Sequence, residues 1–248
     1  MGAGERADRA LVARGLFESR AKARAAIEAG QVSADGRPVL RPSDLIAPQA
    51  KVEARPAHPW VGRGALKLLQ ALETWPIAVE GRVVLDVGAS TGGFTEVCIA
   101  RGAGRVYAVD VGRGQLHPRV AGDPRVVSLE GFDARDLSPA SVPEAPGLVV
   151  CDVSFIALAK ALPAALGLAA PGADLVALVK PQFEVGRDKV GKGGLVKDPA
   201  ARQAALEAVV GFLEGEGWRV EATAQSATPG GEGAIEFLVW ARKSAAPR

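Results

Sequence analysis

Four ionisable residues stand in apolar stretches, where an isolated charge is costly. Lys67 lies in GRGALKLL, Asp152 follows LVVC, Lys180 follows LVALV, and Glu236 stands inside AIEFLVW. A buried charge costs several kcal/mol unless it is paired, so we expect two lysines and two carboxylates to form one compensating cluster. The cluster has two interpretations. It is either a structural ion-pair network or a site for removing a proton.

The catalytic interpretation assigns a role to each of the four. A lysine made neutral by burial and a neighbouring cation can take the proton of a weakly acidic hydroxyl group. Lys180 is the candidate base and Lys67 the neighbouring cation. Asp152 and Glu236 would hold both lysines and balance their charge. The chain has only 2 His and 2 Cys, in unrelated contexts, so His-based triads and a metal site are not expected.

A glycine-rich turn offers a place for a ligand. The segment LDVGASTGGFTEV joins an apolar strand to a helix, and ligands bind at such turns on the carboxyl edge of parallel sheets. Its spacing differs from G-x-G-x-x-G, so a pyrophosphate is not favoured. An ordinary structural loop is the alternative. The residues expected to bind a cofactor here are Asp86, Gly88, Ala89, Ser90, Thr91, Gly92, Gly93 and Phe94.

Two further carboxylates follow the next strands. Asp110 ends the second strand, where it can accept hydrogen bonds from ribose hydroxyls. Asp133, after the third strand, is expected to face adenine. Together they indicate a nucleoside ligand.

The elements that position these residues are short Val-rich strands alternating with helices. Strands are expected at 82–88, 105–111, 125–130, 148–154, 174–180, 218–224 and 234–241, with helices at 65–72, 94–102, 155–169 and 198–217. This alternation predicts a parallel sheet covered on both faces, an α/β Rossmann-like domain. The segment QSATPGGEG is too short for a crossover helix, so the last strand should be antiparallel. Such a sheet resembles the seven-stranded class I methyltransferase fold.

A small basic region precedes this domain. Residues 1–60 contain 10 Lys and Arg against 7 Asp and Glu, while 61–248 contain 20 against 21. Helices are expected over 6–14 and from Ser19 to Gly30, then a hairpin at Asp35-Gly36. A polyanionic partner fits this charge, and a merely solvated surface is the alternative. The residues expected to contact such a partner here are Arg6, Arg9, Arg14, Arg20, Lys22 and Arg24.

The large domain has cations at its own active edge. The glycine-rich segment FEVGRDKVGKGGLVKD should form a flexible loop beside that edge, with an ordinary solvated loop as the alternative. Its candidate RNA contacts, together with one residue near the start of the domain, are Arg63, Arg187, Lys189 and Lys192.

Composition and apolar patterning indicate where in the cell the protein is expected. The chain of 248 residues is 48% hydrophobic, enough for a large core, and contains no apolar run near the ~20 residues that cross a bilayer. The N-terminus lacks the apolar region of a secretion signal. Cys98 and Cys151 stand in apolar runs and are expected to be buried free thiols. We expect a cytoplasmic protein.

Both regions resemble known protein families. RADRALVARGLFESRAKARAAIEAGQVSADGRPV resembles the S4 RNA-binding domain, expected over residues 1–55, with a linker at 56–61. Residues 62–248 resemble FtsJ-like ribose 2′-O-methyltransferases, which use S-adenosylmethionine (SAM), and Lys67, Asp152, Lys180 and Glu236 match their tetrad. With DVGASTGGFT, CDVSFI, VKPQFE and GAIEFL, the whole chain resembles the TlyA family. Ala65, Phe132-Asp133 and Ala234 depart from its usual residues, and the Phe132-Asp133 change bears on the adenine contact.

The TlyA resemblance implies a function. It implies SAM-dependent methylation of ribose in ribosomal RNA, at a cytidine of 16S or 23S rRNA, without a metal or a membrane. Two other classes stay open: a non-catalytic RNA-binding or ribosome-assembly protein, and a membrane-active haemolysin. The nucleotide methylated, the choice of subunit and the oligomeric state are not decided by the sequence.

Overall fold

The computed structural model describes residues 4–244. The chain forms two compact units, divided between Pro59 and Trp60. This division lies inside the segment predicted to be the linker. Each unit has its own apolar core, and each is described here by itself.

The N-terminal unit packs two short helices on small sheets. Helices α1 (Ala7–Ala13) and α2 (Arg20–Glu28) bury Leu11 and Ile27. The Ser19 hydroxyl accepts a hydrogen bond from the Lys22 N–H and caps α2, as predicted. Strands β2 (Val32–Ala34), β3 (Arg37–Pro38) and β5 (Val52–Ala54) form one sheet, while β1 (Glu5–Arg6) pairs with β4 (Leu45–Ile46). The hairpin at Asp35-Gly36 joins β2 to β3, which confirms the predicted turn.

The large unit is built on a seven-stranded sheet in the order β11-β12-β10-β9-β6-β7-β8. The strands are β6 (Val83–Val87), β7 (Arg105–Asp110), β8 (Val126–Glu130), β9 (Leu148–Cys151), β10 (Asp174–Val179), β11 (Trp218–Gln225) and β12 (Phe237–Lys243). Strand β12 is antiparallel to both of its neighbours, while the other pairs are parallel, which confirms the predicted class. The strand order reverses between β6 and β9. In open α/β sheets, ligands bind at this point of reversal.

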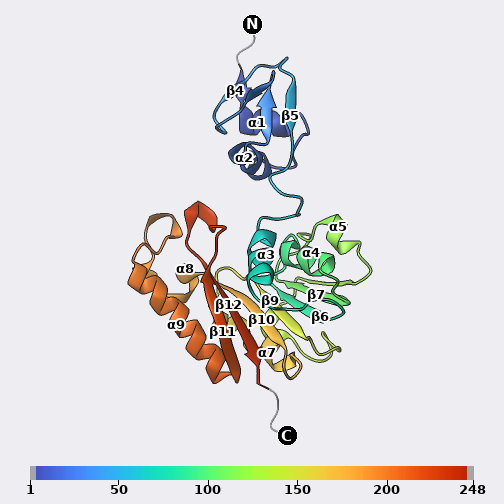
Figure 1. The fold of residues 1–248 in the computed structure, drawn as a ribbon, viewed down its shortest axis with the longest axis vertical. Coiled ribbons are helices and arrows are strands. Elements are labelled where there is room, and N and C mark those ends of the chain that lie inside the picture. Colours follow the sequence, from blue (N-terminus) through green and yellow to red (C-terminus); the bar gives the residue numbers. More distant parts are fainter. Residues whose placement is uncertain (1–3, 245–248) are drawn as a thin grey trace. The chain divides into compact units, whose positions relative to one another are not determined.

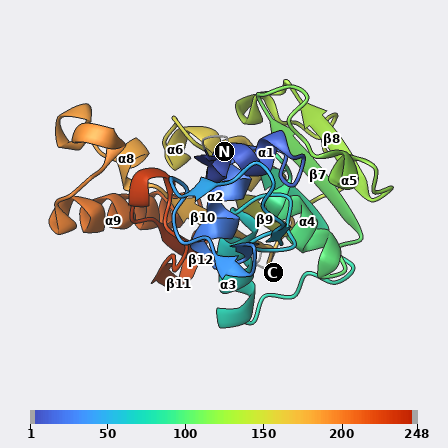
Figure 2. The same cartoon turned by 90° about the horizontal axis from the view of Figure 1, so that it is seen from above.

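Helices cover both faces of the sheet (Figures 1 and 2). On one face, α3 (Ala65–Thr74) and α4 (Gly93–Ala100) pack against Val84, Val150 and Val176. On the other face lie α6 (Leu158–Ala161), α7 (Pro163–Leu168) and α9 (Pro199–Gly215). Short α5 (Pro118–Ala121) and α8 (Pro181–Glu184) follow β7 and β10. Cys98 and Cys151 are buried free thiols, as predicted.

Two predicted elements differ from the structure. The helix expected over 155–169 is divided into α6 and α7, because Pro163 has no N–H to continue the hydrogen-bond ladder of α6. The strand expected over 234–241 begins only at Phe237, so Glu236 lies just before β12 and not within it. This shift places Glu236 at the same end of the sheet as the strand ends that carry Asp152 and Lys180.

Candidate functional site

The four ionisable residues form two ion pairs. Lys180 Nζ lies 2.6 Å from Asp152 Oδ1, and Lys67 Nζ lies 2.5 Å from Glu236 Oε2. The Lys67–Glu236 pair is almost wholly buried, whereas Asp152 keeps a fifth of its side chain exposed. Each lysine therefore has a carboxylate of its own, and the predicted charge compensation occurs in two separate pairs.

The fold explains how the Lys180–Asp152 pair forms. Asp152 and Lys180 are the first residues after β9 and β10, which are adjacent and parallel. Side chains that follow adjacent parallel strands emerge at the same edge, so the pairing follows from the topology.

The second pair joins a helix to a strand end. Lys67 comes from α3, and Glu236 precedes β12. A Cβ built on Gly230 would lie 2.2 Å from Glu236 Oε1, so the backbone of the β11–β12 connection closes over this carboxylate. The Glu236 carboxylate is therefore enclosed by backbone on one side and paired with Lys67 on the other.

A cavity of about 200 Å³ joins the Lys180–Asp152 pair to the glycine turn. Its lining comes from residues 62–64, from the glycine turn and from the ends of β9 and β10. The residues that line it are Gly62, Arg63, Gly64, Gly88, Ala89, Ser90, Thr91, Gly93, Phe94, Asp152, Ser154 and Lys180. The structure thus brings most of the predicted cofactor residues together with two of the four predicted catalytic residues, while Lys67 and Glu236 do not line this cavity.

Two glycines in the turn permit close contact with neighbouring segments. Gly88 has φ +84°, and a Cβ there would lie 2.9 Å from the Asp152 carbonyl oxygen. Gly92 has φ +91°, and a Cβ there would lie 2.8 Å from Leu116 Cδ1. Any larger residue would be strained in this backbone region and would collide with its neighbours. Gly88 thus lets the turn lie against the strand end that carries Asp152, and Gly92 lets it lie against the Leu116 side chain.

Asp110 is oriented by the turn itself. Its Oδ2 accepts a hydrogen bond from the Ser90 N–H (2.8 Å), and its Oδ1 accepts one from the Gly112 N–H (2.7 Å). A carboxylate oxygen can accept more than one hydrogen bond, so Asp110 keeps capacity for a ligand hydroxyl. It does not itself line the cavity described above.

Asp86 lies beneath the turn and is fully buried. Its Oδ2 accepts a hydrogen bond from the Thr95 hydroxyl (2.6 Å), while its Oδ1 has no partner among the described residues. Burial is the main cause that raises the pKa of Asp86 to about 7, and the nearby Asp152 and Asp110 carboxylates add to the increase. Asp86 thus supports the turn from below without lining the cavity.

Asp133 is engaged locally. Its carboxylate accepts the Arg135 N–H and pairs with the Arg135 guanidinium at 2.6 Å, which lowers the pKa of Asp133 to about 2. This places the carboxylate at the start of the short 3₁₀ turn Ala134–Asp136. The adenine contact stays a prediction.

Most of the predicted N-terminal cations have protein partners. Arg6 and Arg20 both pair with the buried Asp8, at 3.1 and 2.6 Å, and lower its pKa to about 2. The Arg14 guanidinium donates to the carbonyls of Ala47, Pro48 and Ala50. Arg9 pairs with Glu5 and Lys22 with Glu18.

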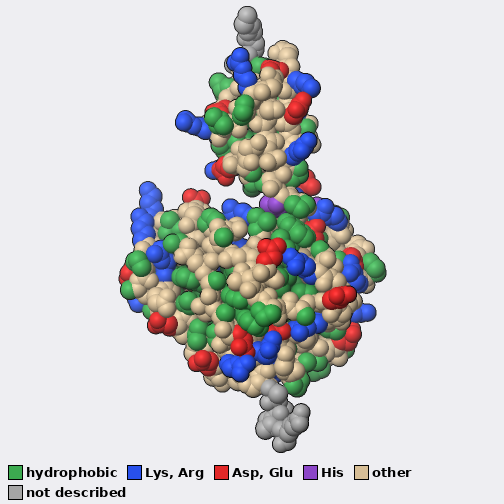
Figure 3. All heavy atoms as spheres, in the orientation of Figure 1, with side chains coloured by type: hydrophobic (Ala, Val, Ile, Leu, Met, Phe, Trp, Pro, Cys, Tyr) green, Lys and Arg blue, Asp and Glu red, His purple; other side chains and the backbone are tan. Residues whose placement is uncertain are grey.

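Arg24 is different. It is exposed, and among residues 4–244 it has neither an ion pair nor a side-chain hydrogen bond. Figure 3 shows Lys and Arg side chains on both sides of this unit, not on one side alone. Of the six predicted N-terminal cations, Arg24 is therefore the one whose guanidinium can contact a phosphate without first leaving a protein partner.

The remaining predicted cations belong to the large unit. Arg63 is exposed and lines the cavity. Arg187 and Lys189 form a 3₁₀ turn, Arg187–Lys189, and Lys192 begins another, Lys192–Gly194, both in an exposed segment after α8.

Two residues beside the site escaped the sequence analysis. The Ser154 hydroxyl accepts a hydrogen bond from Lys180 Nζ at 2.9 Å. Phe155 is 89% exposed, has φ +67°, and places its ring 5.1 Å from that of Phe183. The polar serine two residues after Asp152 could have indicated the first. Nothing in an apolar residue's identity indicates that it will be exposed.

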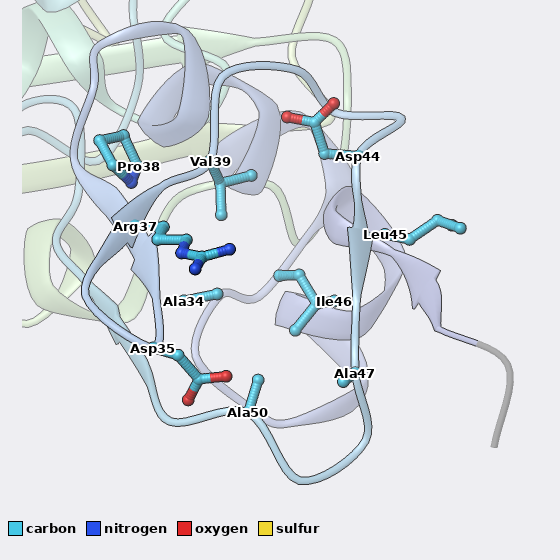
Figure 4. Close-up of a pocket in the computed structure, with 10 residues that line it drawn as sticks. All are labelled: Ala34, Asp35, Arg37, Pro38, Val39, Asp44, Leu45, Ile46, Ala47 and Ala50. Carbon is cyan, nitrogen blue, oxygen red and sulfur yellow. The ribbon is translucent and has the colours of Figure 1, made fainter. Parts of the chain in front are cut away.

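A second cavity lies in the N-terminal unit, between β3 and β4 (Figure 4). Arg37 is directed into it, while Leu45 points away. Asp35 and Asp44 at its rim accept backbone N–H groups of Lys51, Leu40 and Arg41, so they serve as turn caps. It holds none of the residues predicted for catalysis.

Each of the two units matches a known protein family. Residues 60–243 match the family model of FtsJ-like methyltransferases, and residues 5–52 match that of the S4 domain. Over 239 residues the chain is 47% identical to the 16S/23S rRNA (cytidine-2′-O)-methyltransferase TlyA of Mycobacterium tuberculosis, covering 96% of this chain and 89% of that protein. The chain belongs to the TlyA family of FtsJ-like methyltransferases.

Other TlyA-family relatives have different names. Hemolysin A of Brachyspira hyodysenteriae is 36% identical, with 94% of this chain and 98% of that protein covered. A solved structure from Streptococcus thermophilus, described as a hemolysin, is 38% identical with a TM-score of 0.77, covering 99% of this chain and 90% of that one. An S-adenosylmethionine-dependent methyltransferase of Listeria monocytogenes, at 14% identity and a TM-score of 0.56, covers 73% of this chain and all of its own, and shows the fold alone.

Proposed function

We propose that this protein is a SAM-dependent methyltransferase that modifies a ribose 2′-OH of ribosomal RNA. The observation that carries the proposal is the cavity in which Lys180 and Asp152 lie beside the glycine turn. In this proposal Lys180 would be the proton acceptor and the glycine turn the cofactor loop of one site. The name of the M. tuberculosis relative supports a cytidine as the target.

The residues present fit SAM. The backbone of Gly88 to Gly93 would cradle it, because small residues let a ligand touch the main chain, and Asp110 would accept hydrogen bonds from its ribose hydroxyls. When bound, SAM supplies a methyl group activated by the sulfonium charge. The carboxylates of Asp152 and Asp110 beside the turn suit this positive charge.

The chain's own residues account for the proton. Lys180 Nζ would take the proton of the 2′-OH as the hydroxyl becomes nucleophilic, and Asp152 would stabilise the ammonium that forms. The Lys67–Glu236 pair is buried and does not line the cavity, and it would hold α3 and the start of β12 together next to the site. Breaking a buried pair leaves an uncompensated charge, so both members are needed for the fold of the site.

Capture of the RNA would involve both units. The S4-like unit would contact folded RNA through its cations, chiefly Arg24, while Arg63, Arg187, Lys189 and Lys192 would contact phosphates near the active edge. The exposed Phe155 ring offers a stacking surface for a base beside Ser154. Ribosomal RNA or a ribosomal subunit would thus be the partner, and the cytoplasm the place of action.

The haemolysin alternative depends on the name of the Brachyspira relative. Among residues 4–244, no helix is long and apolar enough to cross a membrane. The Lys180–Asp152 site has no role in that alternative, so the proposed methyl transfer is the property to test.

The experiment compares Lys180→Ala with the wild type. Unmodified ribosomal subunits are incubated with tritiated SAM under single-turnover conditions, and the labelled nucleotide is mapped. We expect a loss of about 10²-fold or more in rate, which is typical for a general base, with SAM and RNA binding retained. Lys160→Ala, which removes an exposed lysine of α6, is the matched control.

Thermal melts separate catalysis from structure. If the ion pairs serve only the fold, Lys180→Ala will lower the melting temperature without a specific loss of rate per folded molecule. A folded Lys180→Ala protein that methylates at the wild-type rate would exclude Lys180 as the base.

A further inference from the structure

Ser154 contacts the proposed base directly. Its hydroxyl oxygen accepts a hydrogen bond from Lys180 Nζ at 2.9 Å, on an amine that also lies 2.6 Å from Asp152 Oδ1. Ser154 is exposed and lines the same cavity as Lys180. No role in the mechanism above has been given to it.

The geometry of an amine shows what this contact does. A neutral lysine nitrogen has two N–H bonds and one lone pair, arranged around the Cε–Nζ bond. The contact with Asp152 is an ion pair in which Asp152 Oδ1 accepts no hydrogen bond from the described residues, so by itself it leaves the nitrogen free to rotate and the lone pair more than one position. The hydrogen bond to Ser154 fixes the direction of one N–H and so restricts where the lone pair can point. Lys180 contributes surface to the cavity, where a hydroxyl group would have to approach.

We propose that Ser154 is a positioning residue, which fixes the lone pair of Lys180 toward the cavity so that it meets the ribose hydroxyl. This inference rests on the proposed function, since it assigns Ser154 a task in that reaction. Proton transfer requires a hydrogen-bond distance and the correct orientation, so an amine with two rotational states would be productive for only part of the time.

Ser154 is itself held by its surroundings. Phe155, the next residue, has φ +67°, a strained conformation for a residue other than glycine. Three residues further on, the Leu158 N–H donates to Glu184 Oε1 at 3.0 Å, which ties the segment to α8. Such strain persists only where the surrounding structure imposes it, so the backbone next to Ser154 is restrained.

Ser154→Ala and Ser154→Thr test the proposal. In single-turnover assays with saturating SAM and ribosomal subunits, we expect Ser154→Ala to lower the rate about 10-fold, the size expected when a hydrogen bond to a charged or reacting group is lost. Ser154→Thr keeps the hydroxyl and should restore most of the rate. Ser128→Ala, which removes an exposed hydroxyl on β8, is the matched control and should change nothing.

Binding and stability measurements exclude other roles. Because Ser154 is exposed, its replacement should leave the melting temperature unchanged. The dissociation constant for SAM should stay within about twofold of the wild-type value. A wild-type rate in Ser154→Ala would overturn the proposal. So would a weaker SAM affinity accompanied by a full rate at saturation, which would make Ser154 a cofactor contact.

A measurement without turnover separates this inference from the proposed function. In protein labelled with ¹⁵N at lysine Nζ, the Lys180 resonance can be assigned from its loss in Lys180→Arg. We expect Ser154→Ala to shift this resonance and to accelerate the exchange of the Lys180 Nζ hydrogens with water. Ser154→Thr should restore the wild-type resonance and the wild-type exchange rate. An unchanged resonance would overturn the positioning role. Absence of methyl transfer by the wild type, with the resonance shift present, would refute the proposed function and leave the Ser154–Lys180 contact established.

Discussion

Replacing Asp86 with Asn should remove a strong pH dependence from the stability of the large unit. The pKa of this buried carboxyl is raised from 3.8 to about 7, chiefly by burial. A raised pKa means that the folded state keeps the proton while the unfolded state has released it. The stabilisation is therefore fully present below pH 3.8 and is lost as the pH rises through about 7.

The magnitude follows from the shift. A difference of about 3 pKa units corresponds to about 4 kcal/mol at ~1.4 kcal/mol per unit, with a slope of about −1.4 kcal/mol per pH unit between the two values. Asn cannot ionise, so the Asp86→Asn protein should lack this slope. Its amide can still accept the hydrogen bond that the Thr95 hydroxyl donates to Asp86.

The assay is urea unfolding of both proteins between pH 4.5 and 8.5, followed by tryptophan fluorescence. All four tryptophans, Trp60, Trp75, Trp218 and Trp240, belong to the large unit, so the signal reports that unit alone. Glu184, whose pKa is also raised by burial, is present in both proteins and cancels in the difference. Free energies of unfolding that run parallel over pH 5–8 would refute the reasoning.

Three further outcomes are expected. Asp110→Ala should weaken SAM binding in calorimetry while leaving RNA binding unchanged, because this carboxylate is proposed to hold the ribose; equal SAM affinity would remove it from the site. Arg24→Ala should lower RNA affinity and reduce the slope of log K against log[salt] by up to about 1, as expected for one phosphate contact, and an unchanged slope would assign Arg24 to a solvated surface. The N-terminal unit should lose stability as the pH falls from about 4 to 2, since its Arg partners hold the pKa of Asp8 near 2; circular dichroism of Asp8→Asn should lack this loss, and equal acid sensitivity would contradict it.

The sequence determined the architecture because its signals are local or periodic. Short Val-rich runs separated by helical segments specify a covered parallel sheet, and the short connection before β12 specifies that this strand is antiparallel. Asp152 and Lys180 could be placed at one edge for the same reason, since each directly follows a buried strand.

The tertiary structure decided the partners, which depend on residues far apart in the chain. Glu236 could not be assigned to Lys67 from the sequence, because the start of β12 shifted by three residues and because 169 positions separate the two. Likewise, Arg20 was one of the cations predicted to contact RNA, yet it pairs with Asp8, and the two residues come from different helices. Charge and spacing identify a cationic side chain, and only the tertiary packing shows which group it pairs with.

Ser154 and Phe155 show the same division at the site. The sequence determined that a serine and a phenylalanine follow Asp152, and the strand pattern placed them near the active edge. Only the folded chain, with its left-handed turn at Phe155, directs the serine hydroxyl to Lys180 and leaves the ring in solvent. A turn of this kind is imposed by contacts on both sides of the segment, and no local preference of the residue favours it.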